Sequence, residues 1–79
     1  MKPELHAMVK DLAIQCAYHD YRGDKDRVTK CNREFTGIRQ CTALLLGAEE
    51  GVDVHAVYYE TFSWWKKWFE TVYCNREVT

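Results

Sequence analysis

The fold is decided by the stretch Tyr58-Tyr59-Glu60-Thr61-Phe62-Ser63-Trp64-Trp65-Lys66-Lys67-Trp68-Phe69-Glu70-Thr71-Val72-Tyr73. It holds eight of the eleven aromatic residues of this 79-residue chain, including all three tryptophans. On a helical wheel of about 100° per residue, its apolar side chains cover well over half of the circumference. Such a helix needs cover on two sides, and a small domain supplies only one of them. The second side therefore points to a partner.

The wheel divides the apolar side chains of this helix into an inner stripe and two flanks. The stripe consists of Val54, Tyr58, Phe62, Trp65, Phe69 and Val72. Trp64 and Trp68 lie on one flank, and Tyr59 and Tyr73 lie on the other. Because burying a large aromatic side chain contributes about 2 to 3 kcal/mol, truncating Trp65 or Phe69 should be among the most damaging changes.

A first helix is predicted near the N-terminus, over about 3–19. Pro3 suits the first turn of this helix, and apolar residues then recur at helical spacing. A turn should follow, with Gly23 free to adopt a positive φ and Asp24 placed to cap the next helix.

A second helix is predicted over about 25–46. Its apolar seam alternates spacings of three and four residues and consists of Val28, Cys31, Phe35, Ile38, Thr42 and Leu45. Gly47 should end this helix. Residues 48–51 are then expected to form an acidic turn, with Asp53 capping the third helix.

Residues 52–59 also alternate between apolar and polar side chains, a pattern typical of a short strand. Helix is favoured because the inner stripe continues in phase to Val72 and no second strand is predicted. We therefore predict a single all-α domain over residues 1–79. It is either an antiparallel three-helix bundle or a helical hairpin that packs with the aromatic third helix and is completed by dimerisation.

The composition excludes several classes of protein. The chain is 47% hydrophobic and 29% charged with a formal net charge of -1, so no global field attracts nucleic acid or an anionic membrane. It shows no secretory signal pattern, and its longest apolar run is Leu44-Leu45-Leu46, so a cytoplasmic protein with reduced cysteines is expected. No nucleophile with a base and no glycine-rich phosphate loop is evident, so we predict neither enzyme activity nor a cofactor.

Three cysteines and a histidine raise the question of a metal site. An antiparallel arrangement would bring Cys16, His19, Cys31 and Cys74 near one pole, and three thiols with one imidazole form a known zinc set. The spacing lacks the paired cysteines of zinc knuckles. We therefore interpret Cys16 and Cys31 as small core residues and predict no metal.

These patterns favour a small protein–protein interaction module, such as an adaptor, a regulatory subunit or a phage- or mobile-element-encoded inhibitor of a host protein. The residues expected to bind another protein, or to lie near a homodimer interface, are Tyr59, Trp64, Trp68, Tyr73 and Arg76, because tryptophan, tyrosine and arginine supply most hot spots.

The alternative is a nucleic-acid-binding regulator that uses the basic residues in and before helix two. These residues are Arg22, Lys25, Arg27, Lys30, Arg33 and Arg39. On the wheel they point in several directions, which favours a solvated helix face over a phosphate-binding stripe. Glu60 and Glu70 beside the lysines of the aromatic helix argue against a membrane-surface helix.

Overall fold

The computed structural model describes residues 3–78 and places nearly all of them in helices. The elements in chain order are α1 (Pro3–Tyr21), α2 (Lys25–Leu46), α3 (Ala48–Trp68), the π-helical segment η1 (Phe69–Tyr73) and α4 (Cys74–Val78). The helices α1, α2 and α3 all pack against one another. The prediction of an all-α fold with three packed helices is confirmed, and residues 52–59 are helical.

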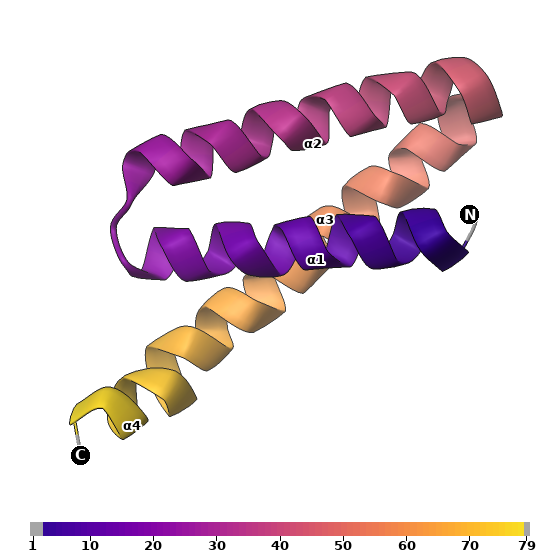
Figure 1. The fold of residues 1–79 in the computed structure, drawn as a ribbon. Coiled ribbons are helices and arrows are strands. Elements are labelled where there is room, and N and C mark those ends of the chain that lie inside the picture. The colour runs from indigo at the N-terminus through magenta and orange to yellow at the C-terminus, as the bar shows by residue number, and fades with distance from the viewer. Residues whose placement is uncertain (1–2, 79) are drawn as a thin grey trace.

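The three helices form an elongated bundle. Figure 1 shows α1 and α2 as an antiparallel hairpin, with α3 crossing α1 and continuing through η1 and α4 beyond the hairpin. The molecule measures 47 × 23 × 16 Å. A helical run from Ala48 to Val78 spans about 46 Å at about 1.5 Å per residue, so this run accounts for the long dimension.

The connection between α1 and α2 follows the sequence prediction. Gly23 has φ 76°, a conformation that residues with a side chain rarely adopt. The Asp24 side chain caps α2, because its Oδ1 accepts a hydrogen bond of 3.2 Å from the backbone N–H of Arg27. As a result α2 begins at Lys25, and α1 extends two residues further than predicted, to Tyr21.

The predicted acidic turn at residues 48–51, with Asp53 as a cap, is wrong. A single residue, Gly47, separates α2 from α3 and reverses the chain with φ 106° and ψ 160°. Its N–H closes α2 by bonding to the carbonyl of Ala43 at 3.1 Å, and residues 48–51 form the first turn of α3. The acidic side chains in this turn are favourable there, because the N-terminus of a helix carries partial positive charge.

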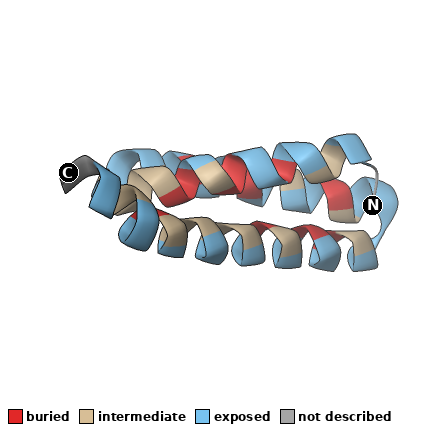
Figure 2. Ribbon diagram, turned by 90° about the horizontal axis from the view of Figure 1, so that it is seen from below, coloured by how far each residue is buried: buried red, intermediate tan, exposed pale blue. Residues whose placement is uncertain are grey.

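The core lies along the facing sides of the three helices (Figure 2). Its buried members are Val9, Leu12, Ala13, Cys16, Cys31, Phe35, Val54 and Tyr58. The rings of Phe35 and Tyr58 stack at its centre, with centroids 3.8 Å apart and an interplanar angle of 10°. The Tyr58 hydroxyl donates a hydrogen bond of 3.1 Å to Asn32 Oδ1, so the polar atom of this buried ring has a partner.

The predicted seam of α2 is buried along its first part and exposed at its end. Cys31, Phe35 and Thr42 are buried, whereas Leu45 is 82% exposed. Figure 1 shows that the last turn of α2 extends beyond the first turn of α1, which therefore does not cover it.

The π-helical segment changes the phase of the aromatic helix. Its hydrogen bonds run from residue i+5 to residue i, as from the Cys74 N–H to the Phe69 carbonyl, and each residue turns through less than 100°. Phe69 remains buried, but Val72 is 39% exposed, and the partly buried Tyr73 takes its place on the inner side. The predicted position of Val72 in the inner stripe is therefore wrong.

A contact between α2 and α3 explains why a glycine occupies position 51. A Cβ atom on Gly51 would lie 3.0 Å from the Cβ of Ala43, and an alanine Cβ cannot rotate away. We expect Gly51→Ala to lower the free energy of unfolding by about 1 to 3 kcal/mol, because the helices must separate. Urea denaturation followed by circular dichroism measures this change.

Gly37 provides the matched control for this substitution. It is exposed within α2, and an added Cβ would meet nothing within 4 Å. Gly37→Ala should therefore raise the free energy of unfolding by up to about 1 kcal/mol, the ordinary helix-propensity difference. An equal gain from both substitutions would show that the helices do not approach closely at Gly51.

Candidate interaction surface

The C-terminal end of α1 holds the aromatic helix through a cluster of rings. Tyr18 and Tyr21 of α1 contact Phe69 and Tyr73 of η1, with ring centroids between 5.4 and 6.3 Å apart. We call these four residues the aromatic cluster. Most of the pairs are edge-to-face, a geometry that adds to the stabilisation from burial alone. Trp68 extends the cluster along α3, with its centroid 5.3 Å from that of Phe69.

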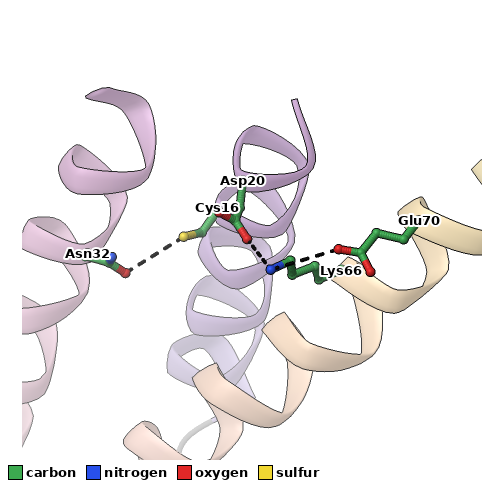
Figure 3. Close-up of polar contacts among 5 residues, drawn as sticks. All are labelled: Cys16, Asp20, Asn32, Lys66 and Glu70. Atoms are coloured by element: carbon green, nitrogen blue, oxygen red, sulfur yellow. Dashed lines mark hydrogen bonds and ion pairs between the residues drawn. The ribbon is translucent and has the colours of Figure 1, made fainter. Parts of the chain in front are cut away.

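An ion pair beside this cluster links α3 to α1. Lys66 Nζ lies 2.8 Å from Asp20 Oδ2 and 3.9 Å from Glu70 Oε1 (Figure 3). The hydrogen bond from Lys66 to Asp20 raises the pKa of the lysine. Because these side chains are a third to a half exposed, the pair adds little stability. It directs Lys66 toward α1, while Lys67 remains exposed.

Trp64 forms a ridge between two hollows. It is 60% exposed, and its ring meets that of Trp65 edge-on with centroids 5.0 Å apart. An inner hollow of about 330 Å³ between α1 and α3 is lined by His6, Lys10, Ile14, Val57, Glu60, Thr61, Trp64 and Trp65. An outer hollow of about 530 Å³ on α3 is lined by Tyr59, Glu60, Ser63, Trp64 and Lys67. An exposed indole with polar groups around it is the composition typical of interaction sites.

The structure brings together two of the five predicted binding residues. Tyr59, which is 46% exposed, and Trp64 both line the outer hollow. The Tyr59 ring is supported by His55 and Phe35, with centroids 4.6 and 6.1 Å away. The surface formed by Tyr59, Trp64 and the two hollows is the candidate interaction surface.

The other three predicted binding residues lie elsewhere. Trp68 is partly buried against Phe69 and Tyr73, and Tyr73 packs on α1 within the aromatic cluster. The prediction that Tyr59 and Tyr73 lie on the same flank of the aromatic helix is therefore wrong. Arg76 is exposed in α4, beyond the aromatic cluster.

Sequence reasoning missed the contribution of α1 to this surface. His6, Lys10 and Ile14 line the inner hollow, and their spacing of four residues places them on one side of α1. That spacing was available in the sequence as a signal. These residues face α3 because of the way α1 and α3 cross, and the spacing alone does not predict that crossing.

The basic residues of α2 do not form one stripe. Arg27 pairs with Asp24 at 3.3 Å, and Arg33 lies beside a shallow depression with Thr29 and Asn32. Arg39 faces a different hollow, between α2 and α3. Phosphate binding along a helix needs such charges on a common side, so the arrangement does not favour nucleic acid.

The four cysteines are free thiols in different surroundings. Cys16 and Cys31 are buried, Cys41 is exposed and Cys74 is partly buried. Figure 3 shows Cys16 directed at Asn32, whose Oδ1 accepts from its thiol over 3.8 Å. Burial raises the pKa of Cys31, with a further contribution from the neighbouring Cys16, so its thiol is held neutral.

The four candidate zinc ligands do not meet. Within residues 3–78, no group of three or more histidine, cysteine, aspartate or glutamate side chains is arranged to hold a metal ion. Cys16 and Cys31 are neighbours in the core, but His19 and Cys74 do not complete a site with them.

The part of the chain that the structure describes contains no helix both long and apolar enough to cross a bilayer. No protein-family model, curated protein or solved structure matches this chain.

Proposed function

We propose that this chain is a small protein–protein interaction module that binds another protein through the candidate interaction surface. An adaptor, a regulatory subunit and a phage- or mobile-element-encoded inhibitor of a host protein all fit this role. We place it in the cytoplasm, where its free thiols stay reduced. Neither catalysis nor a cofactor is part of the proposal.

The exposure of Trp64 is the observation that carries the proposal. A fully covered tryptophan buries about 150 to 250 Å² of surface. Because Trp64 is 60% exposed, it forgoes much of the free energy that burial would contribute. The core does not need this side chain, because Trp65 and Trp68 already link α3 to Phe69 of the aromatic cluster. Tryptophan is also the residue most enriched among interface hot spots.

We expect Trp64→Ala to reduce recovery of the bound protein by about 30-fold, the equivalent of about 2 kcal/mol for one hot-spot residue. Helical content should stay unchanged, because the side chain is mostly exposed. The measurement is cross-linked affinity capture from the source cell with quantitative mass spectrometry, comparing the original chain with the variant.

Leu44→Ala is the matched control. Leu44 is 86% exposed near the end of α2, and it lines neither hollow of the candidate interaction surface. The same proteins should be recovered with this variant as with the original chain. If Trp64→Ala retains them all, or Leu44→Ala loses them instead, the surface has been assigned to the wrong part of the molecule.

A further inference from the structure

One side of α3 and η1 carries a strip of exposed side chains. Its members recur every three or four residues and are Ala56, Glu60, Ser63, Lys67 and Thr71. We call this strip the outer face. Tyr59 and Trp64 border it, and Ser63, a small residue, lies at its middle. A small residue at a helix surface allows a second helix to pack against it at the usual distance between helix axes, about 8 to 10 Å.

The outer face carries two charges of opposite sign. Within residues 3–78, neither Glu60 nor Lys67 takes part in an ion pair, whereas the neighbouring Lys66 is held by Asp20 and Glu70. Glu60 and Lys67 are seven residues apart, two helical turns or about 10.5 Å, so they cannot pair within one helix. Each charge therefore lacks a counterpart among the side chains that the structure describes.

These two charges make the outer face complementary to itself. In an antiparallel pair of identical helices, residues equally far from the two-fold axis lie opposite each other. The midpoint between Glu60 and Lys67 falls beside Ser63. An axis there would place Glu60 of each copy opposite Lys67 of the other, so one geometry satisfies all four charges.

We propose that the occupant of the outer face is a second copy of this chain, docked antiparallel about a two-fold axis near Ser63. Glu60 of each copy pairs with Lys67 of the other, and the rings of Tyr59 and Trp64 close over the sides. This inference rests on the proposed function, because it identifies the protein that the candidate interaction surface binds. Charge pairs of this kind determine the orientation of the two copies and disfavour pairings of the two helices in other registers.

The test is sedimentation equilibrium at tens of micromolar, with the original chain and two charge-reversed variants. The original chain should be a dimer. Glu60→Lys places four lysines at the interface and Lys67→Glu places four glutamates there, so each variant alone should dimerise more weakly by about tenfold or more. An equimolar mixture of the two should recover dimers, because a mixed pair has two lysines on one copy facing two glutamates on the other.

Glu34→Lys is the control, because it reverses an exposed charge on α2 and should leave the dimer unchanged. A monomeric original chain would overturn the inference, as would variants that dimerise normally or a mixture that stays monomeric. Trp64-dependent recovery of a different protein would then still support the proposed function. If the chain is monomeric and no protein is recovered in a Trp64-dependent way, both proposals are wrong.

Discussion

Replacing Tyr58 with alanine should cost about 3 to 5 kcal/mol of unfolding free energy. Tyr58 is 1% exposed, and its ring stacks on Phe35 at the centre of the core. The substitution would leave a cavity between all three helices and remove the hydrogen bond to Asn32. A domain of this size has roughly 4 to 12 kcal/mol in total, so a quarter or more of its stability would be lost. Urea denaturation followed by circular dichroism provides the measurement.

The adjacent tyrosine offers a control with the same chemistry. Tyr59 is 46% exposed, and Tyr59→Ala should cost less than about 1 kcal/mol. Tyr58→Phe keeps the stacked ring and removes only the hydroxyl, so it should cost about 1 kcal/mol. Equal losses from Tyr58→Ala and Tyr59→Ala would show that Tyr58 is not the central residue of the core.

Phe69→Ala should cost a similar amount, about 3 to 5 kcal/mol, by a different route. Phe69 is 7% exposed and contacts every other ring of the aromatic cluster. Its removal would leave only Tyr73 of the cluster to pack η1 on α1, so we expect the near-ultraviolet circular dichroism of the packed rings to fall together with the denaturation midpoint.

Val72→Ala tests the phase shift of the π-helical segment. If the segment continued as an α-helix, Val72 would lie on the inner stripe, and its truncation would be costly. Because Val72 is 39% exposed, its truncation should cost less than about 1 kcal/mol. A loss from Val72→Ala that matched the loss from Phe69→Ala would contradict the observed register.

Local signals in the sequence predicted the helices well. Asp24 and Gly47 marked both ends of α2, and the structure has that helix at Lys25–Leu46. The same Gly47 also begins α3, and the sequence offered no sign that one residue would suffice for the reversal. The acidic residues after it are typical of a turn and equally of the first turn of a helix, so composition alone did not separate the two.

The placement of the aromatic side chains was predicted less completely, because a wheel describes one regular helix without its neighbours. It put Trp65 in the inner stripe, yet Trp65 is only partly buried, so its truncation should be milder than that of Phe69. Burial of Tyr73 depends on Tyr18 and Tyr21, which belong to another helix. The wheel also assumes a constant turn per residue, which η1 does not follow.

The confinement of all three tryptophans to the C-terminal part of α3 also has an optical consequence. The core around Tyr58 contains no indole, so tryptophan emission arises entirely from Trp64, Trp65 and Trp68 on α3. The wavelength of tryptophan emission therefore reports whether this part of α3 is exposed to water or covered, and it does so without an added label. Backbone dichroism, in contrast, reports on every helix, so the two signals coincide during unfolding only if the aromatic end and the rest of the bundle melt as one unit.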